Sequence, residues 1–309
     1  MKKRLIPFAL LLVLLISACS SGSSEEGSNN SKGNEENKSN TITYQSENGP
    51  VEVPADPKRV IVLSTFAGNV MSLDVNLVGV DSWSKMNPNF EEELKDVEEV
   101  TDENLEKIIE LDPDLIIGLS NIKNVDKLKE IAPTVTFTYG KVDYLTQHIE
   151  IGKLLNKEEE AKSWVEDFKK RAKAAGEDIK AKIGEDATVS VIENFEKQLY
   201  VFGDNWGRGT EILYQEMKLK MPEKVKEAAL EQGYYALSPE VLSEYAGDYI
   251  IFSKNPGTDN SFQETETYKN IPAVKNDRVF EVNAKEFYFN DPITLEYQLD
   301  FFKEAFLGK

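Results

Sequence analysis

The sequence predicts an α/β fold in which two lobes are joined by one long helix. Short β-type runs alternate with helical patterns along most of residues 41–309, and such alternation is typical of α/β domains. One uninterrupted helical pattern divides these runs into two groups. The roughly 270 residues after position 40 suffice for two lobes of ordinary domain size.

Each group of runs contains its own strands and helices. In the first half, strands are expected at 59–64, 77–81, 114–119 and 134–139, and helices at 66–74, 103–111 and 124–131. In the second half, strands are expected at 187–195, 198–203, 248–253 and 278–283, and helices at 209–217, 238–246 and 292–307. Pro133 ends the third helix, since proline cannot continue one.

The long helical pattern covers about residues 157 to 183. Its apolar residues recur at a period near 3.6 and share one face: Ala161, Trp164, Val165, Phe168, Ala172, Ala175, Ile179 and Ile183. At 1.5 Å per residue the helix is about 40 Å long, enough to run along two lobes. We therefore predict an N-terminal lobe at 41–155, a linking helix at 156–184 and a C-terminal lobe at 185–309.

The N-terminus has the pattern of an exported lipoprotein. Three positive residues precede an apolar run, Leu5 to Ile16, which is too short to span a bilayer as a stable anchor. Small residues then precede Cys19, the only cysteine, as in the lipobox of bacterial lipoproteins. Residues 1–18 are predicted to be a lipoprotein signal peptide and Cys19 to carry the lipid. The alternative is an ordinary secretory signal that happens to contain a cysteine.

Residues 20–40 contain no apolar side chain, so they are expected to form a disordered tether behind the lipidated Cys19. The predicted location is the extracytoplasmic face of a bacterial cell membrane.

Composition excludes several classes of function. The net charge of −19 argues against nucleic acid or an anionic membrane surface as a partner. One histidine cannot build a transition-metal cluster, and His148 is expected to be a surface or half-buried structural residue. No G-x-S-x-G elbow or phosphate-binding loop is present. We expect no catalytic residue, no directly bound metal and no cofactor.

The most unusual segment is YVFGDNWGRGTE at 200–211. Trp206 and Arg208 alternate with glycines where a predicted strand leads into a predicted helix, the position at which α/β folds bind ligands. Tryptophan and arginine together offer a surface that is both aromatic and cationic. The structural alternative is a tight turn with a packing tryptophan.

Other aromatic residues occupy similar positions. Tyr139 and Phe66 follow strands, Trp83 lies in a polar loop, and Tyr288 precedes the last helix within FYFNDP. Three consecutive aromatics cannot all face inward, so Tyr288 is expected to face a cleft. All four could line one cleft, although aromatics here could also belong to the core.

Arginine is scarce in the folded part of the chain. Arg59 and Arg278 open strands and Arg171 belongs to the long helix, which leaves Arg208 as the one arginine well placed for a cleft. A strongly anionic ligand would need several cations, because an uncompensated charge is costly to remove from water. Three hydroxamates around Fe³⁺ form a neutral core, which one or two donors and aromatic surface could bind.

A short pattern occurs once in each half. Glu106 lies eight residues before Asp114, and Glu240 lies eight residues before Asp248; each aspartate opens an apolar strand. Each glutamate is expected early in a helix. Duplication would explain the repetition, but acidic residues also favour helix N-termini because of the helix dipole.

The sequence resembles the FhuD-type hydroxamate-siderophore-binding lipoproteins of Gram-positive bacteria, including the YxeB type of Bacillus. The resemblance covers nearly the whole body of the chain. It rests on the segments at 51–63, 64–68, 105–117, 131–139, 184–195, 200–211, 245–251 and 287–294. The GDNWGRG segment is the specific one, whereas the PKR opening and the DPDLII run are shared with cobalamin, haem and siderophore binders.

This resemblance implies a class III binding protein with two Rossmann-like lobes, one long helix and a shallow cleft between the lobes. It implies that Trp206 and Arg208 contact the iron-hydroxamate core. Tyr200 and Tyr139 match aromatic cleft residues, Tyr288 is similar to a wall residue, and the Trp83 loop is similar to the YxeB type.

The resemblance also implies partners. Glu106 and Glu240 match the pair of acids, one per lobe, that docks onto arginines of a permease. The expected partners are the permease dimer of an ABC importer with its ATPase, and a ferric siderophore of the ferrioxamine or ferrichrome type. The protein itself is expected to be a monomer.

The alternatives are a catecholate, haem or cobalamin binder of the same fold, and more remotely a cell-envelope hydrolase or a structural adhesin. A hydrolase would need a nucleophile–base pair, which the sequence does not offer. An adhesin would leave the Trp-Gly-Arg loop unexplained.

Overall fold

The computed structural model describes residues 40–308. The predicted signal peptide, the lipidation site Cys19 and the predicted tether up to residue 39 lie outside the described residues. Within the described part, no helix is both long and apolar enough to cross a membrane.

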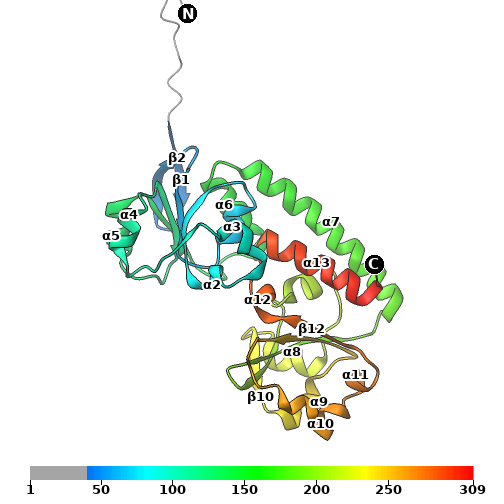
Figure 1. Ribbon diagram of the computed structural model, residues 1–309. Coiled ribbons are helices and arrows are strands. Elements are labelled where there is room, and N and C mark those ends of the chain that lie inside the picture. The colour runs from blue at the N-terminus through cyan, green and yellow to red at the C-terminus, as the bar shows by residue number, and fades with distance from the viewer. Residues whose placement is uncertain (1–39, 309) are drawn as a thin grey trace, which may run out of the picture. The chain divides into compact units, whose positions relative to one another are not determined.

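The first half of the chain forms a β-hairpin and a parallel sheet (Figure 1). The strands are β1 (Thr41–Ser46), β2 (Gly49–Pro54), β3 (Val60–Val62), β4 (Leu77–Val80), β5 (Glu98–Glu99), β6 (Leu115–Leu119) and β7 (Thr134–Phe137). Strands β1 and β2 pair antiparallel, and the other five follow the order β5-β4-β3-β6-β7 with every pair parallel. A parallel sheet of this kind is buried on both faces, and its central strands β3, β4 and β6 are correspondingly apolar, whereas the edge strand β5 consists of two exposed glutamates.

Short helices connect these strands. They are α1 (Ala67–Met71), α2 (Ser82–Lys85), the 3₁₀ helix η1 (Pro88–Phe90), α3 (Glu91–Leu94), α4 (Leu105–Glu110), α5 (Val125–Ile131) and α6 (Tyr144–Leu154). Asp143 caps α6 by accepting hydrogen bonds from the backbone N–H groups of Leu145 and Thr146, at 3.1 and 3.0 Å.

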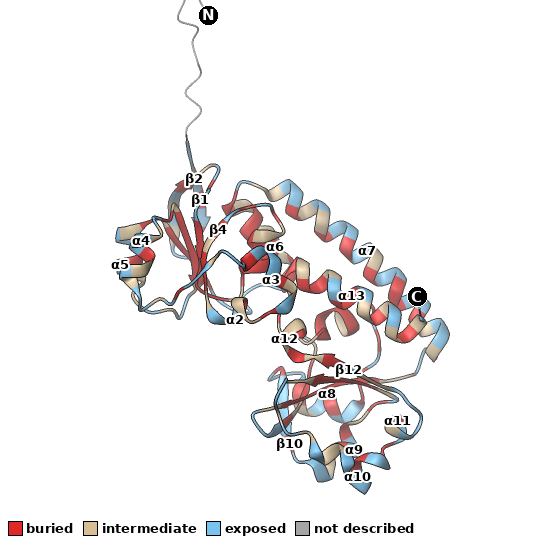
Figure 2. Ribbon diagram, in the orientation of Figure 1, coloured by how far each residue is buried: buried red, intermediate tan, exposed pale blue. Residues whose placement is uncertain are grey.

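The long helix α7 (Glu158–Ile183) follows, as the apolar period predicts. Its buried face contains Ala161, Val165, Phe168, Ala172, Ala175, Gly176 and Ile179, while the other face is exposed (Figure 2). It packs against α6 and the terminal helix α13 (Pro292–Leu307). Three glutamates in its first turn and two lysines in its last complement the helix dipole.

The second half forms a mixed sheet. Its strands are β8 (Val189–Phe195), β9 (Gln198–Phe202), β10 (Tyr234–Leu237), β11 (Tyr249–Lys254) and β12 (Val279–Asn283), in the order β10-β9-β8-β11-β12. Strands β8, β11 and β12 are parallel, whereas β9 runs antiparallel to both β8 and β10. The antiparallel part arises because a two-residue turn, Glu196-Lys197, reverses the chain directly after β8.

Helices of this half are mostly short. They are the π-helix η2 (Glu211–Glu216), α8 (Glu223–Ala229), η3 (Pro239–Val241), α9 (Leu242–Tyr245), η4 (Ser261–Glu264), α10 (Glu266–Lys269), α11 (Pro272–Lys275) and α12 (Ala284–Phe287), besides α13.

Two segments predicted to be helices are not simple α-helices. Residues 211–216 form a π-helix, in which the Met217 N–H bonds to the Ile212 carbonyl at 2.8 Å. Residues 238–246 divide into a 3₁₀ turn and a short α-helix after Pro239. Apolar spacing over two turns does not separate these helix types from an α-helix.

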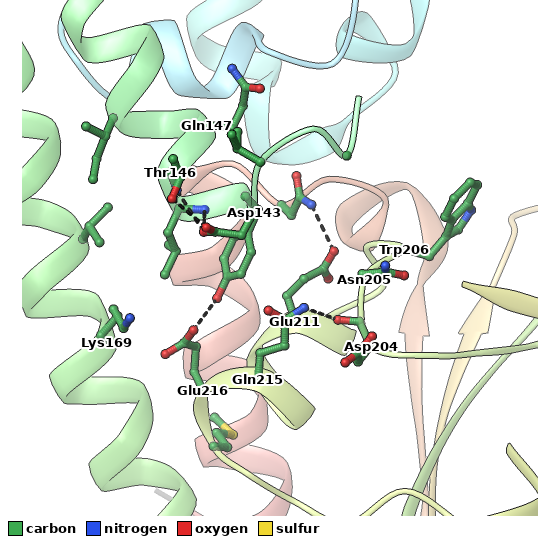
Figure 3. A pocket seen from close by; sticks show the side chains of 18 of the residues that line it. Asp143, Thr146, Gln147, Lys169, Asp204, Asn205, Trp206, Glu211, Gln215 and Glu216 are labelled. Carbon is green, nitrogen blue, oxygen red and sulfur yellow. Dashed lines mark hydrogen bonds between the residues drawn. The ribbon is translucent and has the colours of Figure 1, made fainter. Parts of the chain in front are cut away.

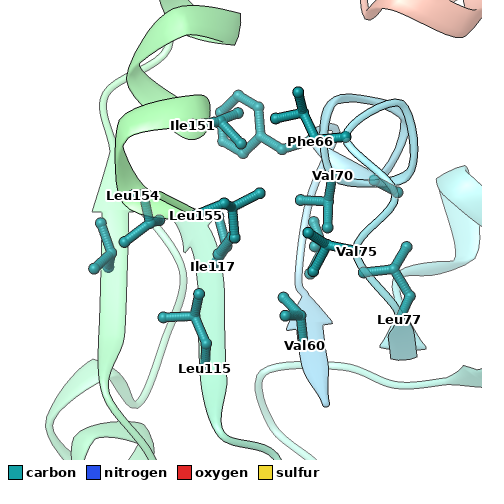
Figure 4. Close-up of a cluster of buried hydrophobic side chains, with 14 of the residues drawn as sticks. Val60, Phe66, Val70, Val75, Leu77, Leu115, Ile117, Ile151, Leu154 and Leu155 are labelled. Carbon is teal, nitrogen blue, oxygen red and sulfur yellow. The ribbon is translucent and has the colours of Figure 1, made fainter. Parts of the chain in front are cut away.

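The hydrophobic core follows the two sheets. The first cluster packs side chains of β3, β6 and β7 against α1 and α6, and Figure 4 shows part of it. Phe289, from the segment before α13, also belongs to this cluster although it follows β12 in the chain. The second cluster packs the buried face of α7 against β8, η2 and α13. The segment before α13 therefore fixes the last part of the chain to the first sheet.

Candidate functional site

The glycine-rich segment forms a tight loop between β9 and η2. Gly207, Arg208 and Gly209 all have positive φ, at 68°, 60° and 81°. The Arg208 N–H donates to the Phe287 carbonyl at 2.7 Å, and a Cβ added at Gly207 would lie 2.3 Å from the Tyr288 carbonyl oxygen. Only glycine permits this approach at that conformation, so the glycine spacing dictates how the loop presents Arg208.

Arg208 makes a buried ion pair. Its Nε and Nη2 donate to the Glu193 carboxylate at 3.0 and 3.3 Å, and its Nη1 donates to the Trp206 carbonyl at 3.1 Å. The Glu193 side chain is fully buried, whereas 16% of the Arg208 side chain is exposed. The pair therefore presents a guanidinium edge to the surface, with its charge balanced beneath.

Aromatic rings enclose the guanidinium. Its Cζ lies 4.7 Å from the ring centroid of Tyr288 and 4.8 Å from that of Phe202, within the range of cation–π attraction. The Tyr288 hydroxyl donates to Asn255 Oδ1, and burial next to Glu193 raises the pKa of Tyr288 to about 12. The ring of Trp83, from α2, meets Tyr288 edge-on at 5.5 Å.

A second group of rings surrounds Trp206, whose carbonyl oxygen accepts the hydrogen bond from Arg208. Tyr139 contacts Trp206 edge-on at 6.0 Å, Tyr234 lies 5.2 Å from Trp206, and Tyr200 lies 5.8 Å from Tyr234. Trp83, Tyr139, Trp206 and Tyr234 are each more than a third exposed. Exposed aromatic rings gathered in one contact network are typical of a binding surface.

Two of these contacts join the two halves of the chain. Tyr139 follows β7 and Trp83 belongs to α2, whereas Trp206 and Tyr288 come from the second half. Of the predicted ligand-binding residues, the structure thus brings Trp83, Tyr139, Tyr200, Trp206, Arg208 and Tyr288 into one network, while Phe66 lies apart from it.

Phe66 is a core residue. It is 5% exposed and packs edge-on against Phe137 at 5.6 Å, because α1 turns its ring under the sheet. It also belongs to the lining of the cavity described next. Its burial leaves little of the ring accessible, and a part for Phe66 in ligand binding stays a prediction.

A cavity of about 1460 Å³ adjoins the aromatic network. Tyr139 and Trp206 line both, whereas Trp83, Tyr200, Arg208 and Tyr288 do not line the cavity. Figure 3 shows Trp206 at one end and Lys169 of α7 at the other. The Tyr139–Trp206 contact therefore belongs both to the aromatic network and to the lining of this cavity, and the single cleft lined by all the named residues stays a prediction.

His148 is more buried than expected. It is 2% exposed, lies 3.3 Å from Asn69 Nδ2 through Nδ1, and contacts the Trp164 ring edge-on at 5.3 Å. Burial lowers the pKa of His148 to about 4, so it is neutral at physiological pH. No group of three or more His, Cys, Asp or Glu side chains in the described part of the chain is arranged to hold a metal ion.

Glu106 and Glu240 occupy matching places in the two halves. Both are exposed, in the first turns of α4 and η3. Eight residues later, Asp114 accepts hydrogen bonds from the N–H groups of Lys58 and Arg59, and Asp248 accepts from Thr188. Each aspartate thus fastens the start of its own strand to the parallel neighbour, which explains the repeated pattern structurally.

Three residues of the network were not predicted from the sequence. Glu193 stands in the apolar run VSVIENF, where one acid among buried positions is a detectable signal. Tyr234 opens the edge strand β10, which the sequence did not reveal. Glu211, which ends the glycine-rich segment, is buried and accepts hydrogen bonds from the Gly207 N–H at 2.9 Å and Asn290 Nδ2 at 3.0 Å. Burial raises the pKa of Glu211.

Comparison with known proteins agrees with this geometry. Residues 69–286 match the model of the family described as periplasmic binding protein. The chain belongs to this family. The iron(3+)-hydroxamate-binding protein FhuD of Bacillus subtilis is 39% identical over 272 residues, covering 86% of each chain.

Two solved structures are also similar. FhuD2 from Staphylococcus aureus with bound ferrioxamine B has a TM-score of 0.76 and 35% identity, covering 82% of this chain and 99% of that one. A FhuD-fold component of a Fep/Fec-like ferrichrome ABC transporter from Bacillus subtilis has a TM-score of 0.79 and 37% identity, covering 85% and 99%. The predicted fold class is confirmed, and the chain is a binding protein rather than an enzyme.

Proposed function

We propose that this periplasmic binding protein captures ferric hydroxamate siderophores and delivers them to an ABC importer. The observation that carries the proposal is the guanidinium edge of Arg208, charge-balanced by Glu193 and surrounded by exposed aromatic rings. A neutral tris-hydroxamate complex of Fe³⁺ offers carbonyl and hydroxamate oxygens to a hydrogen-bond donor and apolar linkers to aromatic faces. The names of its relatives, which bind iron(3+) hydroxamate and ferrioxamine B, support this ligand class.

The ligand-contacting residues we propose are Trp206, Arg208, Tyr139, Tyr200 and Tyr288, with Trp83 at the margin. Trp206 and Tyr139 would meet the complex from opposite halves of the chain, because their rings now touch each other. Ligand entry would separate this pair, so their contact is exchanged for contact with the siderophore. No protein side chain is required on the iron, since three bidentate hydroxamates complete its coordination.

Membrane attachment and delivery form the second part of the proposal. Cys19 would carry a diacylated lipid, placing the protein on the extracytoplasmic face of the membrane. Glu106 and Glu240, each on a surface turn of its own sheet, would bind cationic residues of a permease dimer served by its ATPase.

A titration of the purified protein with a panel of iron complexes tests the ligand class. Ferrioxamine and ferrichrome are expected to quench tryptophan fluorescence with a Kd of about 1 µM or below, about −8 kcal/mol. Ferric catecholate, haem and cobalamin are expected to bind more weakly. Tighter binding of any of these three than of both hydroxamates would overturn the proposal.

A further inference from the structure

We infer that Glu193 determines the charge of the iron complex that the site accepts, by cancelling the charge of Arg208 so that neutral complexes bind in preference to anionic ones. The inference rests on the proposed function, because it concerns the ligand that the Arg208 edge would meet. It adds a specificity-determining residue that has no contact with solvent and would itself touch no ligand.

Glu193 is held rigidly. It lies on β8, opposite Ser253 of β11 and Tyr200 of β9, and is fully buried. Oε2 accepts from Arg208 Nε at 3.0 Å and from the Ser253 hydroxyl at 2.7 Å. Oε1 accepts from Arg208 Nη2 at 3.3 Å and from Asn255 Nδ2 at 3.4 Å. Both oxygens are therefore engaged, and the carboxylate cannot turn away from the guanidinium.

This arrangement fixes the charge beneath the ligand surface. Arg208 is the one arginine in the aromatic network, and its guanidinium is mostly buried. Unpaired, it would attract anions strongly, since a cation with little water around it is poorly screened. Paired with Glu193, it adds a donor edge but no net charge. An anionic complex entering this surface would lose hydration without gaining a counter-charge.

The charges around the adjoining cavity do not favour one sign. Its lining contains five acids, Asp204 and Glu211 among them, and six lysines. Lys254, at the end of β11, is paired with Glu281 rather than directed to the network. No described cation other than Arg208 contacts an aromatic ring of the network, so the net charge that a bound complex meets depends on whether Glu193 is ionised and present.

Replacing the carboxylate by its isosteric amide tests the inference. Glu193→Gln keeps an oxygen that can accept from Arg208 and Ser253 but removes the negative charge. Equilibrium dialysis with radiolabelled iron would give the Kd of a neutral complex, ferrichrome, and of a trianionic ferric tris-catecholate. The ratio of the catecholate Kd to the ferrichrome Kd is expected to fall at least tenfold in Glu193→Gln.

Two further variants make the test specific. Glu281→Gln removes a carboxylate paired with a lysine on the same sheet, and its ratio is expected to equal that of the wild type. Asn255→Asp adds a negative charge beside Glu193 at a half-buried position, and its ratio is expected to rise. Because this variant changes the charge in the opposite direction, it still tests the inference if Glu193→Gln does not fold.

The outcomes separate the inference from the proposed function. If Glu193 serves only to hold the fold, Glu193→Gln weakens both complexes by the same factor, and an unchanged ratio overturns the inference. An unchanged ratio in Asn255→Asp does the same. If the wild-type protein binds no ferric hydroxamate at all, the proposed function fails instead.

Discussion

Arg208 combines two roles that a single substitution would separate. Its guanidinium edge is available to a ligand, while its Nε and Nη2 neutralise a carboxylate that has no access to water. Removal of the side chain therefore removes a donor from the surface and leaves Glu193 buried without its partner. The cost of an unpaired buried charge exceeds that of a lost surface contact.

Arg208→Ala is expected to weaken ferric hydroxamate binding by about 1.5–3 kcal/mol, as for a charged hydrogen-bond donor. It should also lower the free energy of unfolding by about 3 kcal/mol. Equilibrium dialysis and urea unfolding measure the two effects. In the double variant Arg208→Ala/Glu193→Gln most of the stability should return, but not the binding. Wild-type affinity in Arg208→Ala would exclude this arginine from the site.

The sequence allowed prediction of Trp206 and Arg208 because glycines around them marked a loop after a strand. It did not allow prediction of Glu193 as the partner of Arg208, since the two are brought together only by the β8–β9 pairing. The burial of Phe66 could not be predicted either, because a residue after a strand can turn to the surface or into the core.

The loop between β9 and η2 depends on backbone conformation as well as on side chains. Three consecutive residues in the left-handed region bring its backbone against Phe287 and Tyr288. This conformation gives the Arg208 side chain its direction, and it explains why glycines flank the arginine.

Gly207→Ala is expected to destabilise the protein by about 2 kcal/mol more than Gly257→Ala, and to weaken ligand binding. Both glycines have positive φ, but a Cβ at Gly207 would meet the Tyr288 carbonyl oxygen, whereas one at Gly257 would meet nothing within 4 Å. Urea unfolding of the two variants isolates the effect of the close approach. Equal loss of stability in both variants would show that the close approach of Gly207 to the Tyr288 carbonyl does not contribute to stability.

Among the elements, those with a strong apolar pattern were predictable. The long helix was found because its apolar face repeats over seven turns, and the buried parallel strands because they are continuously apolar. The hairpin of β1 and β2, the edge strand β10 and the helix α8 were not predicted. Strand β1 alternates exposed with buried residues and α8 buries Val225 and Ala229 one turn apart, so these elements do carry a pattern, but a short one. In β10 three of the four residues are exposed, so no contrast between buried and exposed positions marks it.

At the scale of the whole molecule, the two halves contain the same kind of hydrogen bond between an aspartate and a neighbouring strand. Asp114 and Asp248 fasten parallel strands in the same manner, and each follows an exposed glutamate by eight residues. The repetition places Glu106 and Glu240 at corresponding points of two sheets. A partner with two equivalent subunits could bind one glutamate with each.

Glu106→Ala/Glu240→Ala is expected to abolish most siderophore-dependent iron uptake in cells, while the purified variant binds ferric hydroxamate normally. The reason is that both carboxylates are exposed, and neither belongs to the residues whose rings or guanidinium form the aromatic network. Uptake of radiolabelled iron and a parallel titration measure the two properties. Glu110→Ala/Glu231→Ala, which removes two other exposed glutamates, serves as the matched control and should transport normally. Normal uptake by the first double variant would remove the docking proposal.

The relation between the two halves was the least predictable feature. The chain gives no local signal that Tyr139 will touch Trp206 or that Trp83 will touch Tyr288, because both contacts depend on how α7 and α13 hold the sheets. For the same reason, the separate polar cavity beside Tyr139 and Trp206 could not be foreseen.

The position of the iron in crystals grown with ferrioxamine or ferrichrome is the most direct test of the account. The anomalous signal of iron is expected as one peak among Trp206, Tyr139 and Tyr288, with Arg208 donating to the hydroxamate oxygens and still paired with Glu193. A peak in the polar cavity near Lys169, or no peak at saturating ligand, would contradict the account.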